Sequence, residues 1–286
     1  MFDFSEDEVF FMLVAAAVSG WGLFQWFRVI VARPTLGAAL GGYQRARLAI
    51  LPVLCLAFAA AVIWNWSDPT AVAGHIDYVI LFIAGAGAWF SLTILSLSTL
   101  GINVRHDVVV NGNRAAAISV AGAALATTLI YTGGNIGAGP TIWTTIFPAA
   151  LGSLTLLLFW FVIETSSGVS DAITIDRDRA TGIRIAGWAI ATAIILGRSV
   201  AGDWTGWDST FEEFVTLGWP SAVLTGSAIA IQMRFRPSPE VPHPSERSGM
   251  LTALLMVLFA ILYVMSTPPP EIGEHVITYE EYMNLR

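Results

Sequence analysis

Uncharged, apolar runs recur along this 286-residue chain, and several are long enough to cross a membrane. A helix needs about 20 apolar residues to span the hydrocarbon core of a bilayer. Residues 115–163 carry no charge, which is too long for one helix and indicates two, joined at the Gly- and Pro-rich segment 133–140. The pattern predicts an all-α polytopic bundle of eight membrane helices over Val9–Phe27, Leu48–Ser67, Tyr78–Val104, two within 115–163, Arg179–Val200, Phe214–Met233 and Met250–Met265.

The arginines divide unevenly between the two sides of such a bundle. With eight spans, 12 of the 14 arginines fall on one side, whereas the other side carries 14 of the 21 acidic residues. Because arginine-rich loops stay in the cytoplasm, we expect the N- and C-termini to be extracytoplasmic. The chain is then one integral membrane domain over residues 1–267, followed by a short acidic extracytoplasmic tail over 268–286.

Composition excludes several classes of protein. Hydrophobic residues make up 55% of the chain and charged residues only 12%, about half the charged share of a soluble domain. All 14 basic residues are Arg, so a Schiff base to lysine cannot form. A net charge of −7 without a basic stripe argues against a nucleic-acid partner. We find no catalytic or metal-binding motif, and therefore expect no enzyme activity, no metal and no cofactor.

The middle of the chain contains an internal repeat with an offset of 65 residues. Nine of 17 positions are identical between residues 114–130 and 179–195. The repeat unit is a helical hairpin, about 76–138 in the first copy (helices three and four) and about 141–203 in the second (helices five and six). Both hairpins enter from the same side of the membrane, so this is a parallel repeat.

Small residues recur at helical spacing in the fourth and sixth spans. Small side chains let helix backbones approach closely. The candidate centre of helix packing is Ala121, Gly122, Ala186 and Gly187.

The polar stretches that precede the fourth and sixth spans resemble those of a known protein family. The first copy runs from Asp107 through Asn111-Gly112-Asn113-Arg114 to Ala121-Gly122, and the second from Asp171 through Asp176-Arg177-Asp178-Arg179 to Ala186-Gly187. Over residues 76–203 this duplicated pattern resembles the bacterial membrane family known as domain of unknown function 350. The resemblance implies a bacterial inner-membrane protein and brings with it no established activity.

The charged groups of the sixth span lie near its ends. Arg184 and Arg198 are expected to snorkel towards opposite faces of the membrane. Glu164 falls at the same end as Arg184 and could pair with it. Asn113, and Asp178 at the matching place of the second copy, are expected to cap their helices.

Two functions from different classes fit these features. The first is a scaffold or accessory subunit, whose partners are the lipid bilayer and other membrane subunits or further copies of the chain. The second is a channel or facilitator for a small solute or ion, with the repeat interface as its path. Candidate polar path or ion-pair residues are Asn111, Asn113, Thr127, Glu164, Arg184 and Thr192. A water-filled cavity between the fourth and sixth spans, lined by Thr127, Thr192 and Ser119, would favour the channel, and a solid seam of small residues the scaffold.

Overall fold

The computed structural model describes residues 4–31, 42–70, 72–238, 240 and 244–273, and every regular element in these ranges is a helix. Residues 274–286 of the predicted acidic tail lie outside the described ranges. So does Arg33, one of the 12 arginines counted on the predicted cytoplasmic side. The helices are α1 Glu6–Val31, α2 Gly42–Trp66, α3 Ile76–Thr99, the π-helix η1 Val104–Val110, α4 Arg114–Gly133, α5 Trp143–Ser167, α6 Val169–Thr174, α7 Arg179–Ser199, α8 Trp207–Gly218, α9 Pro220–Phe235 and α10 Glu246–Ser266.

The chain is a multi-pass all-α membrane protein, as the hydropathy pattern predicts. Seven helices are long and apolar enough to cross a membrane, and α8 with α9 adds an eighth crossing if the bent pair is one span. The seventh predicted span, Phe214–Met233, is wrong as a single helix, since α8 begins at Trp207 and meets α9 at 42°. Pro220 has no N–H to donate to the preceding turn, so it starts α9 instead of continuing α8.

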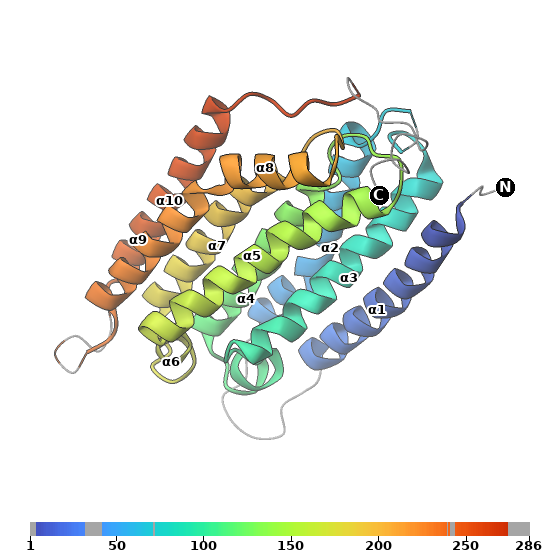
Figure 1. The fold of residues 1–286 in the computed structure, drawn as a ribbon. Helices are drawn as coiled ribbons and strands as arrows, with labels where there is room; N and C mark the ends of the chain where they lie inside the picture. Colours follow the sequence, from blue (N-terminus) through green and yellow to red (C-terminus); the bar gives the residue numbers. More distant parts are fainter. Residues whose placement is uncertain (1–3, 32–41, 71, 239, 241–243, 274–286) are drawn as a thin grey trace.

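Two parallel helices, α4 and α7, run through the middle of the bundle (Figure 1). Their first turns meet where Gly182 faces Ala115, and their last turns meet where Gly133 faces Gly197. On the other side of α7 lies α10, and α1 packs on α3 at the opposite edge. The residues of α7 are mostly buried, whereas α10 buries only Gly249, Met256 and Ala260 among its own residues.

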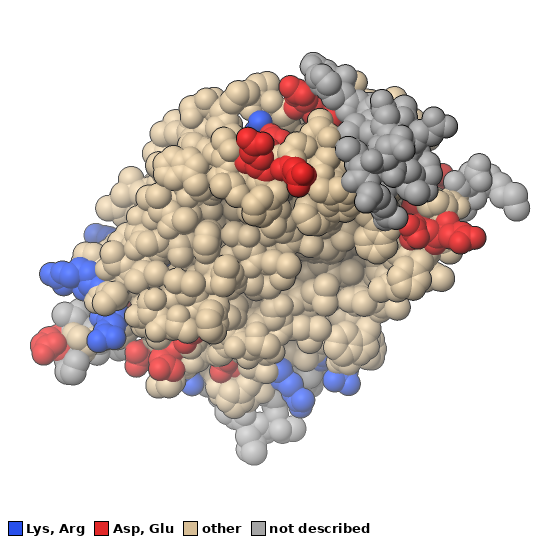
Figure 2. All heavy atoms as spheres, in the orientation of Figure 1, with Lys and Arg blue, Asp and Glu red and all other residues tan. Residues whose placement is uncertain are grey.

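The two ends of the bundle differ in charge. We call the end at which α4, α7 and α10 begin the arginine end, and the opposite one, where α1 begins, the acidic end. On the face seen in Figure 2, blue side chains gather mainly along the arginine end together with some red ones, and most charged side chains at the acidic end are red. This is the uneven distribution that the sequence predicts for the two sides of the membrane.

Candidate functional site

The seam between α4 and α7 is closed by backbone contact. A Cβ added at Gly122 would lie 2.5 Å from the Cα of Ala186, and a Cβ at Gly182 would lie 2.9 Å from the Cα of Ala115. Glycine at these positions allows the two helices to approach to the point where only hydrogen atoms separate their backbones. At both levels the space between the helices is therefore filled by the protein itself.

A second closed seam joins α7 to α10. A Cβ at Gly187 would lie 2.6 Å from the Cα of Ala253 on α10. The four residues expected to form one packing centre are thus divided: Gly122 and Ala186 meet across the first seam, and Gly187 belongs to the second. Ala121 is half-buried and packs against the core from the side of α4. The four residues serve different seams because neighbouring positions on a helix point in different directions.

The hydroxyl groups expected along a solute path are buried. Thr127 accepts a hydrogen bond from Thr93 of α3 at 2.8 Å and donates to the carbonyl of Ala123 at 3.0 Å. Ser119 donates to its own helix, to the carbonyl of Ala115 at 3.1 Å. Thr192 is fully buried, and its hydroxyl finds no hydrogen-bond partner among the described residues. Two of these three hydroxyls, those of Thr127 and Ser119, are therefore already hydrogen-bonded within the helix bundle.

Asn113 and Asp178 cap α4 and α7 in the same way, 65 residues apart. Each side chain accepts from two backbone N–H groups of the first helical turn, at 2.9 and 3.2 Å. The residues directly before the two caps both have a positive φ, 63° at Gly112 and 53° at Arg177. Asn113 also donates to the carbonyl of Ile173 at 2.7 Å, which ties the start of α4 to α6. The expected capping role is present at both helix starts.

Asn111, another candidate polar residue, lies at the end of η1 and not at the start of α4. It is half-buried at the end of η1, where its backbone N–H donates to the carbonyl of His106 at 2.9 Å. It therefore ends the short π-helix ahead of the Asn113 cap.

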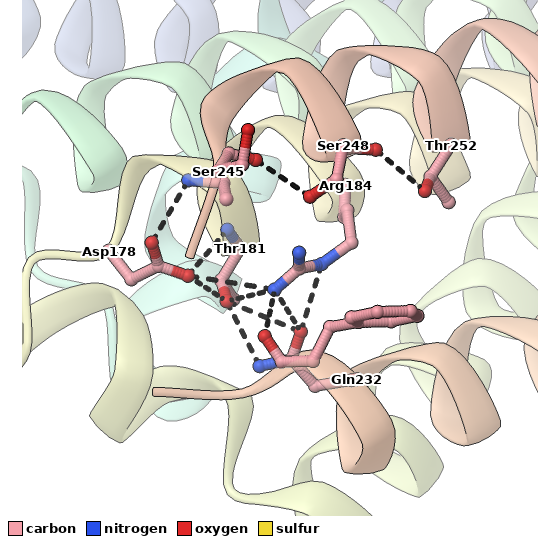
Figure 3. Close-up of polar contacts among 9 residues, drawn as sticks. Asp178, Thr181, Arg184, Gln232, Ser245, Ser248 and Thr252 are labelled. Atoms are coloured by element: carbon pink, nitrogen blue, oxygen red, sulfur yellow. Dashed lines mark hydrogen bonds and ion pairs between the residues drawn. The ribbon is translucent and has the colours of Figure 1, made fainter. Parts of the chain in front are cut away.

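A polar network surrounds Arg184 at the arginine end (Figure 3). The side chain is only 5% exposed, and its Nη2 lies 3.5 Å from Asp178 Oδ2. Nη2 donates to the hydroxyl of Thr181 at 2.8 Å, to Oε1 of Gln232 at 3.1 Å and to the carbonyl of Phe235 at 3.2 Å. Gln232 closes the network by donating to Thr181 at 3.0 Å. The guanidinium thus joins α7 to the end of α9.

Two expectations about the charged groups of this end are corrected by the structure. Arg184 does not snorkel, because Asp178 compensates its charge and Gln232 accepts a hydrogen bond from it inside the protein. Glu164 is not its partner, since its carboxylate accepts instead from the N–H and the hydroxyl of Ser170, at 2.8 and 2.6 Å. Gly168, with φ of 59°, turns the chain from α5 into α6 and brings Ser170 back to Glu164.

Arg198 is held in a comparable way near the acidic end. Its Nη2 and Nε donate to the carbonyl of Pro268 at 2.6 and 3.2 Å, and its Nη1 donates to that of Ala201 at 3.3 Å. Glu213 of α8 lies 3.7 Å away. This arginine is also buried, and it fastens the segment after α10 to the end of α7.

The acidic end contains a cavity of about 140 Å³. It lies among the first turns of α1, α3 and α5, the α2–α3 connection and the α4–α5 connection, and its lining includes Asn135 and Thr141. The oxygens Asn135 Oδ1 and Thr141 Oγ1 are buried without a hydrogen-bond partner among the described residues. This is the opposite of the Arg184 network, in which the polar groups bind one another.

The α4–α5 connection is a structured element where the sequence pattern predicts a turn. Ser67 donates to the carbonyl of Asn135 at 2.7 Å, and Gly137 N–H donates to the carbonyl of Trp66 at 3.2 Å. On its other side, Ala138 N–H donates to Asp203 Oδ1 at 2.8 Å. Sequence reasoning missed Asn135 as a functional candidate, and the available signal was a single amide side chain within a glycine-rich run.

Comparison with known proteins gives one match. A family model described as Domain of Unknown Function (DUF350) matches residues 70–232. The matched segment contains both capping residues, the α4–α7 seam and the whole of α8. No curated protein and no solved structure matches this chain. The resemblance inferred for residues 76–203 is thereby confirmed, and it extends to Gln232 on α9.

Proposed function

Because this chain belongs to the domain of unknown function 350 family, whose description states no activity, we propose a function from the geometry: a non-enzymatic scaffold or accessory subunit of a complex in the bacterial inner membrane. The closed α4–α7 seam carries this proposal. At Gly122 the neighbouring backbone already occupies the position of a side chain. A rigid, filled centre suits a protein that holds partners in place.

The polar groups at the arginine end support a structural role as well. Arg184, Asp178 and Gln232 bind one another across two helices, and Asn113 caps one helix while it donates to another segment. Buried polar groups that are mutually satisfied make a structure rigid. Each of these side chains holds parts of the bundle together, which supports a structural role for them.

The outer face of α10 offers a surface for a partner. Leu254, Leu258 and Leu262 recur every four residues and are 63%, 46% and 57% exposed. Residues at this spacing share one face of a helix. In the bilayer this face meets lipid, another membrane subunit or a second copy of the chain. We further propose that the arginine end faces the cytoplasm and that both termini are extracytoplasmic, on the distribution of arginine.

A channel or facilitator for a small solute or ion is the alternative. The buried hydroxyl of Thr192, which has no hydrogen-bond partner in the described ranges, favours it, because a passing polar solute could bind such a group. A path along the repeat interface would require α4 and α7 to separate at Gly122 and Gly182, where their backbones touch.

Co-purification tests the scaffold role. The tagged chain is extracted in mild detergent, and the associated proteins are identified and quantified by mass spectrometry. We expect a membrane subunit or further copies of the chain in stoichiometric amounts, and less of them after L254A and L258A on α10. The matched control is L154A with L158A, two exposed leucines at the same spacing on α5. A lone monomer that releases solute from proteoliposomes would contradict the scaffold and support the channel.

A further inference from the structure

A groove between α1 and α3 lies at the arginine end of the bundle. Its volume is about 190 Å³, and the last turns of both helices line it together with the start of η1. The lining positions recur every three or four residues, so each helix contributes one face: Trp21, Gln25 and Val29 on α1, and Ser91, Leu95 and Ser98 on α3. α1 is at the edge of the bundle, beside α3 (Figure 1). Since Trp21 and Leu95 are 51% and 45% exposed, the groove opens on the outer surface.

The inner wall of this groove is fixed by packing. A Cβ added at Gly22 would lie 3.2 Å from the Cα of Ser91, so α1 and α3 nearly touch where these two residues meet. Trp26 is 3% exposed, and its indole N–H already donates to the carbonyl of Leu48 at 3.1 Å. Trp26 therefore offers the groove its ring and no free donor, and an occupant enters from the outer surface of the bundle.

The end of the groove near η1 carries hydrogen-bond donors that are available to a ligand. Arg105 is exposed, and its guanidinium makes no hydrogen bond or ion pair with any described residue. Asn103 is also exposed. Its Oδ1 accepts from the N–H of His106 at 2.9 Å, which leaves its amide nitrogen free to donate.

The charge at this end selects an anion. Of the described residues that line the groove, Arg105 alone is charged. Asp107 is close in sequence, but it is 8% exposed and its carboxylate accepts from the N–H of Asn103 at 2.7 Å. Asp107 is outside the lining and forms no ion pair with Arg105. Arginine binds phosphate oxygens through paired N–H donors, so a phosphate group fits this position.

The apolar and cationic parts of the groove follow the order found in a phospholipid. Trp21 and Leu95 fall within the predicted spans Val9–Phe27 and Tyr78–Val104, at the depth of acyl chains, and Arg105 directly follows the second span, at the depth of headgroups. A soluble anion would match Arg105 alone. A zwitterionic headgroup adds an ammonium group, for which the part of the lining that the structure describes provides no acid.

We propose that this groove binds an anionic phospholipid, with one acyl chain against Trp21 and Leu95 and the phosphate at Arg105. Basic pockets between membrane helices bind anionic headgroups in this way. If the arginine end faces the cytoplasm, the lipid comes from the inner leaflet, and that detail alone rests on the orientation proposed above. The site does not depend on the scaffold role, because neither α10 nor the α4–α7 seam contributes to its lining.

Native mass spectrometry of the full-length protein in detergent tests the proposal. The delipidated protein is titrated with phosphatidylglycerol, which is anionic, and with phosphatidylcholine of the same acyl chains, which is zwitterionic. We expect the first phosphatidylglycerol to bind about tenfold more tightly than phosphatidylcholine. Glycerol 3-phosphate, which has a phosphate but no acyl chain, should not displace it. Equal affinities for the two lipids, or displacement by glycerol 3-phosphate, would overturn the proposal.

A charge variant assigns the phosphate to Arg105. R105Q should weaken the binding of phosphatidylglycerol about tenfold, to the level of phosphatidylcholine. The matched control is R247Q, because Arg247 is an exposed arginine at the same end of the bundle, in the first turn of α10 and outside the groove. Equal affinities of R105Q and R247Q for phosphatidylglycerol would contradict the role of Arg105.

A second variant assigns the acyl chain to the groove. S98W places an indole ring in the groove and should also weaken the binding of phosphatidylglycerol. Its matched control is T99W, since the neighbouring Thr99 is equally an exposed residue that donates to the carbonyl three residues earlier, but it is outside the lining. Equal binding by S98W and T99W would overturn the site. R105Q decides the matter if S98W does not fold, because Arg105 has no bond to a described residue to lose. Co-purification of partners through α10 would be unaffected by either result.

Discussion

The α4–α7 seam and the cavity at the acidic end both contain Gly and Thr, yet one is closed and the other is hollow. In the seam, Gly122 lies against the backbone of the neighbouring helix at Ala186, so the missing side chain is replaced by a packed partner. In the cavity wall, Gly137 has a φ of 103° within an irregular connection that is hydrogen-bonded to α2 and to residues 202–204. The α4–α5 connection is hydrogen-bonded to the segments on either side, but it leaves the cavity between them unfilled.

The two regions also differ in whether their buried polar groups are hydrogen-bonded. Beside the seam, Arg184 and Thr181 belong to a network whose members bind one another. In the cavity, Asn135 and Thr141 each bury an oxygen without a partner among the described residues. Glycine and threonine by themselves therefore do not distinguish a packed region from a hollow one in this protein. The distinction comes from what each group faces.

Enlarging a seam glycine should have the largest effect. G122L places a side chain where the backbone of Ala186 already lies, and overpacking of this kind destabilises by about 3 kcal/mol or more. We expect the variant to aggregate on size-exclusion chromatography in detergent, and G187L to behave similarly at the α7–α10 seam. The control is G226L, because nothing lies within 4 Å of a Cβ at Gly226. A G122L protein that elutes and melts like wild type would show that the seam is not closed.

Removing the buried guanidinium should have the next largest effect. R184Q leaves Asp178 without its cation, and breaking a buried ion pair costs about 3 kcal/mol. Asp178 retains its cap bonds, so we expect a folded protein with a clearly lower Tm, less damaged than G122L. R179Q is the matched control, because Arg179 and Glu246 form an exposed pair at 2.9 Å that is worth less than about 1 kcal/mol. Equal losses in the two variants would contradict the role given to the Arg184 network.

A third pair of variants makes the same substitution in both regions. T181V removes a hydroxyl that bonds to Asp178 at 2.6 Å and to Arg184, and should destabilise by about 1–2 kcal/mol. T141V removes a hydroxyl that has no partner among the described residues, so the protein should be unchanged or slightly more stable. Unfolding by denaturant in micelles measures both. A loss at Thr141 as large as that at Thr181 would remove the distinction between the regions.

Much of the fold follows from the sequence, because hydropathy over 20 residues reports directly on membrane crossing. Helix starts were also predictable, since Asn113 and Asp178 act through bonds within the next three residues. The bend at Pro220 was missed because proline is tolerated in many membrane helices, and here it begins a new one.

The polar partners could not be predicted, because they are distant in sequence. Gln232 meets Arg184 from a different helix, 48 residues away. Glu164 found a local partner in Ser170, although a charge-based interpretation favours Arg184. The cavity depends on how the α4–α5 connection bonds to segments at residues 66–67 and 202–204, and the pattern of glycines does not determine such contacts.

Cysteine accessibility tests the closed centre most directly. The single native cysteine, buried Cys55, is replaced by Ala, and one new cysteine is introduced as S119C, T192C or, for comparison, T205C at an exposed position of the acidic end. The three proteins are exposed in proteoliposomes to a water-soluble methanethiosulfonate. A filled α4–α7 centre predicts labelling of T205C while S119C and T192C stay unmodified. Labelling of S119C and T192C at the rate of T205C would reveal a water-filled path through the bundle and contradict the scaffold.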